Sequence, residues 1–298
     1  MAANPEALAT YQPFINLWHC YSIRHGLSFL LDTDDSWIRE NGLPLNWIRW
    51  HAASRHLPFY DYLLVVDPDQ FVVPECWNIS LPAIALEGWA DHLPDLVIRD
   101  TGPPQTLNNG VALIRNSARG RFFIQLLLDK VWWGHMIQHD QGAFDETILE
   151  VLGLENSATS AGPVYDSHCL PFAFPSEEGN EMIALYAMCW WNEVERLAGK
   201  PGKRRSRMVG FVDPRRADIN HVVGFRGTDV PALLYHFAGR SKEWDEMLAK
   251  FGIPRRHTAD CAKVFRVVDE AAGQRACVPG NAGVEDLFGH CPPDLTVC

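Results

Sequence analysis

The sequence predicts an α/β fold with a mostly parallel central sheet, helices on both of its faces and a cysteine-rich C-terminal tail. Three observations support this fold class. Short apolar runs recur along the chain, segments with helical spacing lie between them, and 47% of the 298 residues are hydrophobic, which is enough to bury a large core. Strands that alternate with helices favour parallel pairing, because a crossover helix returns the chain to the same edge of the sheet.

The expected elements follow in order from their spacing and their end signals. Apolar residues at helical spacing, closed at Gly26 and Pro58 in the first two cases, predict helices over 14–25, 45–57, 118–133 and 140–152. Apolar runs bounded by turn residues predict strands over 27–31, 62–66, 96–99, 111–114, 209–212 and 233–237. After a loop-rich middle, we expect the first domain to end near 255 and a cysteine-rich extension to follow, which divides the chain into 1–255 and 256–298.

Two carboxylates, Asp67 and Asp69, stand one residue apart directly after the strand predicted over 62–66. Carboxylate oxygens are ligands for divalent cations, and open α/β sheets bind ligands at the carboxyl ends of their strands. A lone Asp-x-Asp is weak evidence, since it is more often a polar turn between two strands. A second element is needed to favour a metal site.

That second element is the apolar run over 233–237, which contains His236 and is followed by Gly239 and Lys242. A histidine in such a run is often only a hydrogen-bonded core residue. Here the imidazole stands near a strand end, the glycine permits close approach of backbone to a phosphate, and the lysine offers it a positive charge. Together with Asp67 and Asp69, these residues describe a site for a metal ion and a diphosphate, with nitrogen ligation favouring Mn²⁺ over Mg²⁺.

Two further groups of polar residues are candidates for the same site. Asp140 and Gln141 stand at a predicted helix start, where Asp140 could be only an N-cap, or where both could lie beneath a bound sugar and stabilise positive charge on it. Asn108, Asn109 and Gly110 form a turn before a strand. They are either that turn alone or amides that line the pocket.

Composition excludes several classes of partner. The net charge of −11 argues against a protein that binds the backbone of a nucleic acid, which would need a basic stripe. The basic cluster over 200–207 is expected to be an exposed loop. No stretch is apolar and long enough to cross a bilayer, and the first residues have no signal-peptide core.

Cysteine usage indicates an oxidising compartment. Four of the eight cysteines lie near the C-terminus in a tail poor in apolar residues, and we expect them to form disulfides among themselves: Cys261, Cys277, Cys291 and Cys298. The absence of a Cys-x-x-Cys pair argues against a zinc site. The glycosylation triplet at Asn78 adds slight support to a secretory protein.

Several motifs occur in one order over about three quarters of the chain. They are Tyr21-x-x-x-His25-Gly26, the run from Tyr60 to Asp69, the run from Leu107 to Ser117, Asp140-Gln141, Ile219-Asn220, Gly227-x-Asp229 and His236-Phe237-Ala238-Gly239. In these motifs the chain resembles metal-dependent glycosyltransferases of the GT-A fold. It is most similar to the retaining galactosyl-, mannosyl- and xylosyltransferases of fungal and plant Golgi, with the glycogenin-type retaining transferases as neighbours.

This resemblance implies a hexosyl- or pentosyltransferase that takes a sugar from a nucleotide diphosphate, expected to be UDP, passes it to a carbohydrate hydroxyl and retains its anomeric configuration. It implies Mn²⁺ or another divalent cation on Asp67, Asp69 and His236, and catalytic positions at Asp140 and Gln141. The donor-binding positions that it implies are Asp67, Asn108, Asn109, Gly110, Gly239 and Lys242. It also implies a place in the Golgi lumen, with a membrane contact only through an anchor that this chain does not contain.

The chain departs from the family at its start. The family's first strand holds the nucleotide base and should precede the helix over 14–25, but residues 1–13 contain no apolar strand. Either the chain is an incomplete version of a longer protein or it builds the base pocket differently. One alternative is therefore a catalytically silent relative that serves as a subunit or sugar-binding partner. The other is a nucleotidyltransferase, which the lack of a glycine-rich phosphate loop opposes.

Overall fold

The computed structural model describes residues 5–87, 89, 92–100, 107–136, 138–157, 169, 180–201, 204, 206–214, 219–222, 232–236, 248–249, 252–253 and 255–274. Its α-helices are α1 Pro5–His25, α2 Ser36–Glu40, α3 Ile48–His56, α4 Leu81–Leu86, α5 Ala118–Leu128, α6 His139–Ser157, α7 Asn180–Ala198 and α9 Cys261–Gln274. Short 3₁₀ turns are η1 Leu45–Trp47, η2 Leu57–Phe59, η3 Pro74–Cys76, η4 Val131–His135 and η7 Arg255–His257.

The described strands form two sheets. The first has the order β1-β4-β3-β5, from Tyr62–Val66, Val111–Arg115, Leu96–Arg99 and Val209–Val212. The second has the order β2-β7-β6, from Gln70–Val72, Leu234–His236 and His221–Val222. In the first sheet β4 runs antiparallel to both β1 and β3, while β3 and β5 are parallel. Consequently β1, β3 and β5 share one direction, and β4 is inverted.

The expectation of a mostly parallel sheet is therefore wrong for the described strands, which pair in a mixed fashion. β4 follows β3 after only the 11 residues between Arg99 and Val111. A parallel return needs a crossover of a dozen or more residues, so β4 turns back beside β3 in the opposite direction. The second sheet is mixed as well, because β7 is antiparallel to β2 and parallel to β6.

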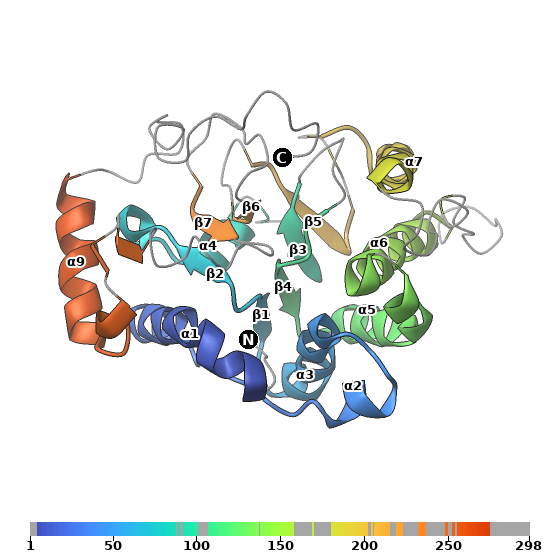
Figure 1. Ribbon diagram of the computed structural model, residues 1–298. Coiled ribbons are helices and arrows are strands. Elements are labelled where there is room, and N and C mark those ends of the chain that lie inside the picture. Colours follow the sequence, from blue (N-terminus) through green and yellow to red (C-terminus); the bar gives the residue numbers. More distant parts are fainter. Residues whose placement is uncertain are drawn as a thin grey trace.

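Helices lie on both sides of the first sheet (Figure 1), with α3, α5 and α6 on one side and α1 and α9 on the other, and side chains on both of its faces are buried. Side chains along a strand point alternately to the two faces. Ala112 and Ile114 of β4 accordingly join the core cluster with α3, α5, α6 and α7. Val111 and Leu113 join the cluster with α1, α4 and α9. This double burial explains why the strands read as continuous apolar runs.

The link between the two sheets positions the candidate site. β1 ends at Val66 and β2 begins at Gln70, so Asp67 and Asp69 lie in the short connection between them. In the second sheet Gln70 pairs with His236, the last residue of β7. Strand direction and register thus place the two carboxylates and the imidazole at one junction.

Three local expectations are wrong. The segment 27–31 forms no strand, and Leu27 and Leu31 are 37% and 36% exposed. The loop-rich middle contains α7, whose Trp190 and Val194 are fully buried. The C-terminal tail contains α9, which packs on the core through Val264. Helix α1 also begins nine residues earlier than expected.

The expected pairing of the C-terminal cysteines among themselves is wrong for Cys261, and Cys277, Cys291 and Cys298 lie outside the described residues. Cys261 bonds to Cys20, which ties α9 to α1 across 241 residues of sequence. A second disulfide joins Cys169 to Cys189, and Cys76 is disulfide-bonded too. The reason is that α9 carries an apolar face and docks on α1, which brings the two sulfur atoms together. Among the described helices, none has the length and apolar character needed to cross a bilayer.

Candidate metal site and its charge network

The side chains of Asp67, Asp69 and His236 converge at the junction of the two sheets, as the sequence predicts. One ligand atom from each lies within 4.8 Å of the other two. The His236 Nε2 atom is 3.3 Å from Asp69 Oδ1 and 3.5 Å from Asp67 Oδ2. The imidazole is buried, whereas the carboxylates are 19% and 14% exposed. The carboxylate oxygens of Asp67 and Asp69 are therefore partly open to solvent, whereas the imidazole beside them is buried.

Hydrogen bonds around Asn108 fix the state of the His236 ring. The Asn108 Oδ1 atom accepts from the Gly110 backbone N–H at 2.9 Å and lies 2.8 Å from Asn220 Nδ2. Because a backbone N–H can only donate, this atom of Asn108 is the oxygen. His236 Nδ1, at 3.0 Å from it, therefore donates and carries a hydrogen. In the neutral ring, Nε2 then carries a lone pair, which is directed at the carboxylates of Asp67 and Asp69.

Such an arrangement calls for a cation. A lone pair and two carboxylate oxygens repel one another unless a proton or a metal ion lies between them. Two carboxylates and one imidazole are a ligand set that suits Mn²⁺ and related divalent ions. The second ring nitrogen, held by the Asn108 amide, shows the kind of outer support that orients metal-binding histidines. The residues present therefore fit a divalent metal ion.

Gly110 lets the parts of the site approach closely. A Cβ at this position would lie 2.4 Å from Gln70 Nε2, 2.6 Å from His236 Cε1 and 2.8 Å from Asn108 Oδ1. Real Cβ contacts are not that short, so any side chain would displace the ring. The Gly110 carbonyl also accepts a hydrogen bond from the Asp67 N–H at 2.9 Å. The Gly110 carbonyl thus fixes the backbone of Asp67, and the missing side chain of Gly110 leaves space for the His236 imidazole.

Arg49 of α3 joins the metal site to a buried carboxylate. Its guanidinium forms ion pairs with Asp67 Oδ1 and Asp140 Oδ2, and it donates to Asn109 Oδ1 at 2.6 Å. Arg49 is 6% exposed and Asp140 is 1% exposed. A buried arginine needs carboxylate partners because an unpaired charge in the interior is costly. Asp67, Asp69 and Asp140 together carry three negative charges against the one positive charge of Arg49, so a divalent cation at the site would balance the remaining two.

Asp140 is enclosed and Gln141 is not. The Asp140 carboxylate accepts from Trp50 Nε1 at 2.8 Å and from Asn109 Nδ2 at 3.1 Å, in addition to Arg49 and to Asn46, which donates to Oδ1. Gln141 is partly exposed, and its Oε1 accepts from the Asn109 backbone N–H at 2.8 Å. The structure thus brings both residues into the network of Asn109, with Asp140 connected to Asp67 through Arg49.

Two residues of the site, Arg49 and Gln70, are not among the site residues predicted from the sequence. Arg49 could have been predicted, because it stands between the apolar residues Ile48 and Trp50 in a helix. A charged residue among apolar ones is usually buried only when it forms an ion pair. Gln70, which is fully buried and donates to Asn220 Oδ1 at 3.4 Å, had no such signal beyond its place after Asp69. The predicted donor contacts Gly239 and Lys242 lie outside the described residues.

The basic cluster over 200–207 departs from the expected exposed loop at Arg204. This side chain is 2% exposed and pairs with Asp100 at 3.0 Å. Its guanidinium also lies 4.4 Å from the ring centre of Trp191 and 5.0 Å from that of Phe211. Burial lowers the pKa of Arg204, although the nearby carboxylates act in the opposite direction. Stacking on aromatic faces is typical of arginine and explains this burial.

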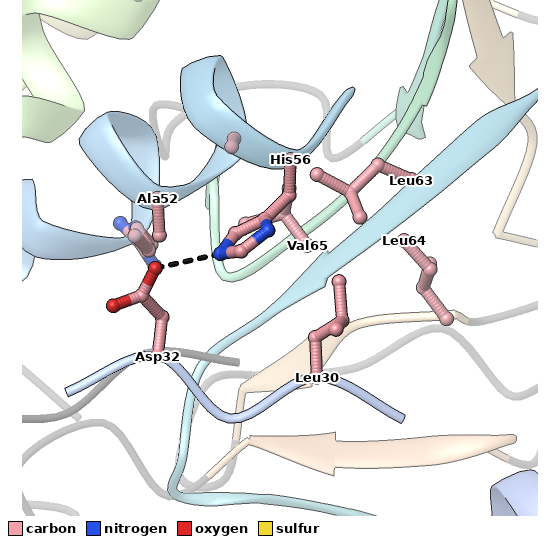
Figure 2. Close-up of a pocket in the computed structure, with 9 residues that line it drawn as sticks. Leu30, Asp32, Ala52, His56, Leu63, Leu64 and Val65 are labelled. Atoms are coloured by element: carbon pink, nitrogen blue, oxygen red, sulfur yellow. Dashed lines mark hydrogen bonds and ion pairs between the residues drawn. The ribbon is translucent and has the colours of Figure 1, made fainter. Parts of the chain in front are cut away.

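A small pocket lies between α3 and β1, and Arg49 is among the residues that line it (Figure 2). It is bounded by Leu30 and Asp32 of one segment, by α3 and by three consecutive residues of β1, 63–65. Consecutive strand residues face opposite sides, so the pocket lies against the edge of β1 rather than on a face. Its polar wall is Asp32, whose Oδ2 is 2.8 Å from His56 Nε2. Asp67, Asp69 and His236 do not line it.

No family model and no curated protein match the chain. Among solved structures, it is similar to a glycosyltransferase involved in the glycosylation of the major capsid of PBCV-1. The identity is 15%, the TM-score is 0.46, and the match covers 84% of this chain and 96% of that one. A likeness this distant does not assign an activity to the chain.

Proposed function

We propose that the protein is a metal-dependent, retaining glycosyltransferase, which moves a hexose or pentose from a nucleotide diphosphate, expected to be UDP, to a carbohydrate hydroxyl. The observation that supports this most is the convergence of Asp67, Asp69 and His236 Nε2, three electron-rich groups of the kind that bind a divalent cation. A bound Mn²⁺ or related ion would stabilise the negative charge of the departing diphosphate.

The chain's own residues take distinct parts in this proposal. Asp67, Asp69 and His236 hold the cation, and Arg49 fixes the orientation of Asp67 through its second ion pair with Asp140. Gln141 is the more exposed of the two predicted catalytic residues, so we assign the contact with the donor sugar to it and a supporting role to Asp140. Asn108, Asn109, Gly110, Gly239 and Lys242 remain the proposed donor contacts. The disulfides favour an oxidising compartment, and we place the reaction in the Golgi lumen.

Binding of Mn²⁺ and sugar transfer should be measured separately. Wild-type protein should bind Mn²⁺ by titration calorimetry, and Asp69→Asn should weaken this at least about tenfold because one charged ligand is lost. The fold should remain, since removing one of two neighbouring carboxylates relieves repulsion. The matched control is Asp61→Asn, which changes an exposed carboxylate at the other end of β1 and should leave Mn²⁺ affinity unchanged.

Turnover is then tested with a panel of nucleotide sugars and Mn²⁺, and the anomeric configuration of the product is read by NMR. Retention of configuration supports the proposal. An inverted product would contradict the retaining mechanism while leaving the metal site standing. Tight Mn²⁺ binding without turnover on any donor would instead favour the catalytically silent relative, a sugar-binding partner that keeps the ligand set.

A further inference from the structure

Asp145 is a buried acid on α6 to which the proposed sugar transfer gives no part. Its side chain is fully buried, and its Oδ1 accepts a hydrogen bond from Gln141 Nε2 at 3.0 Å. Its Oδ2 has no hydrogen-bond partner in the described part of the chain. Burial raises the pKa of Asp145 well above the usual range; the bond from Gln141 opposes this, and the charges of Glu146 and Asp140 add to it.

The amide of Gln141 is fixed from both ends. The Asn109 backbone N–H can only donate, so the Gln141 atom 2.8 Å from it must be the oxygen Oε1. The amide nitrogen then faces Asp145, whose Oδ1 must accept. A flip of the amide would therefore break both bonds at once. The hydrogen-bonded order runs from the Asn109 peptide to Gln141 and on to Asp145.

The chemistry of the Asp145 environment favours the neutral acid. An ionised carboxylate would leave a charged Oδ2 in the interior without a donor, which is among the most costly arrangements in a protein. The neighbouring charges on α6, those of Glu146 and Asp140, are also negative, and the Arg49 guanidinium pairs with Asp140. A protonated Asp145 still accepts through Oδ1 and so still satisfies Gln141.

We propose that Asp145 works as a neutral carboxylic acid and is a positioning residue, which holds the Gln141 amide in the one orientation that supports the Asn109 peptide at the sheet edge. The inference rests on the proposed function only in taking Gln141 and Asn109 as donor contacts. The positioning itself is a property of the chain without any ligand. The position of the Asn109 side chain, which contacts Arg49 and Asp140, depends on the orientation of this same peptide.

Two variants of Asp145 separate the hydrogen bond from the charge. Asp145→Asn is neutral, has nearly the same shape and keeps an acceptor for Gln141, whereas Asp145→Leu removes the acceptor. The Asn109 backbone amide is observed by NMR in protein labelled with ¹⁵N-asparagine. We expect its shift and its slow hydrogen exchange to persist in Asp145→Asn. In Asp145→Leu the shift should change and exchange should accelerate about tenfold.

Mn²⁺ binding is the control for Asp145→Asn, which leaves Asp67, Asp69, His236 and the Asn109 peptide in place, so its affinity should stay within about twofold of wild type. With an active donor, Asp145→Leu should lower turnover more than it weakens binding of the nucleotide diphosphate, and Asp145→Asn should restore turnover. If no variant, including wild type, transfers sugar, the proposed function fails while the NMR result still decides the positioning role.

Three results would overturn the inference. Unchanged protection of the Asn109 amide in Asp145→Leu would mean that Gln141 does not depend on Asp145. Loss of protection in Asp145→Asn would mean that the charge, not the hydrogen bond, is needed. If Asp145→Leu does not fold, infrared difference spectra between wild type and Asp145→Asn decide the point, because the carbonyl band of a protonated carboxyl should be present only in wild type, and its absence would contradict neutrality.

Discussion

At the scale of single residues, Arg49 holds two ion pairs at once, with Asp67 at the open site and with Asp140 in the interior. The two carboxylates would be affected differently if Arg49 were removed. Asp67 can be hydrated when Arg49 is gone, whereas Asp140 is 1% exposed and would keep only neutral donors. The stability of the fold and the geometry of the metal site thus depend on the same side chain.

Arg49→Met should destabilise the protein by about 3–5 kcal/mol, because it leaves a buried carboxylate without its cation. Urea unfolding followed by circular dichroism measures this. In the double variant with Asp140→Asn, the loss should be clearly smaller than the sum of the single losses. Arg39→Met is the matched control, since its ion pair with Asp35 is exposed on the arginine side and should contribute at most about 1 kcal/mol. Strict additivity in the double variant would contradict the pairing.

The raised pKa of Asp145 predicts how stability changes with pH. Its unfolded form releases its proton near the ordinary value of 3.8, while the folded form keeps it to higher pH because of burial. The folded state therefore binds more protons in this window, and its free energy of unfolding should fall as pH rises from about 4 through the folded pKa. Denaturation midpoints measured across this range should fall more steeply in wild type than in Asp145→Asn. Parallel curves would contradict the shift.

At the scale of elements, the strands that the sequence predicts well are those buried on both faces. β1, β3 and β5 lie at the predicted residues because apolar side chains are needed on either side of each. The segment 27–31 has the same composition but stays half exposed, because burial depends on the partner a segment meets. Helix α9 lies in the segment for which the sequence predicts a disulfide-stapled tail. The segment contains a cysteine and a glycine, but it also carries an apolar face, on which Val264 and Val268 recur at helical spacing.

The candidate site was predictable only in part, for a related reason. The sequence predicts that three side chains lie together, because each stands at or near the end of an apolar run and strand ends meet at sheet edges. They are Asp67, Asp69 and His236. The inverted direction of β4 could also have been predicted, because the strands expected over 96–99 and 111–114 leave only 11 residues between them, too few for a parallel return. The partners of Arg49 are set by how α3 packs over the sheet, which periodicity does not specify.

The packing of α6 against η4 gives a prediction at this scale. A Cβ at Gly142 would lie 2.2 Å from the ring of Trp133, a residue that is 1% exposed. Gly142→Ala should therefore destabilise the protein by about 1–3 kcal/mol through overpacking. Gly273→Ala in α9 is the matched control, because nothing lies within 4 Å of its added Cβ and the change should stabilise by about 0.5 kcal/mol. Thermal melting of both variants checks this, and equal effects would contradict it.

At the scale of the whole molecule, the two sheets meet at the candidate metal site, and a disulfide joins α1 to α9. The loop that Cys20–Cys261 closes spans 241 residues, against 20 for Cys169–Cys189. In the chain-entropy account, a longer loop restricts the unfolded chain more. Replacing both Cys20 and Cys261 by alanine should lower the free energy of unfolding by about 2–4 kcal/mol.

Removal of Cys169–Cys189 should cost less under the same conditions, measured by urea unfolding at equal protein concentration. The direction of the difference is the test, because strain in the native state can change either value. A larger loss from the shorter loop would mean that native packing, rather than restriction of the unfolded chain, dominates the contribution of these bonds.

The bond between Cys20 and Cys261 also changes what a protease can do to this protein. Any single cut between the two residues leaves fragments that stay covalently attached, so a nicked molecule keeps both halves of the metal site within reach of each other. Limited digestion should therefore give one band at full length without reductant and separate fragments with it. Nicked protein should recover its Mn²⁺ affinity after dilution from urea, because the halves recombine as one molecule rather than as two.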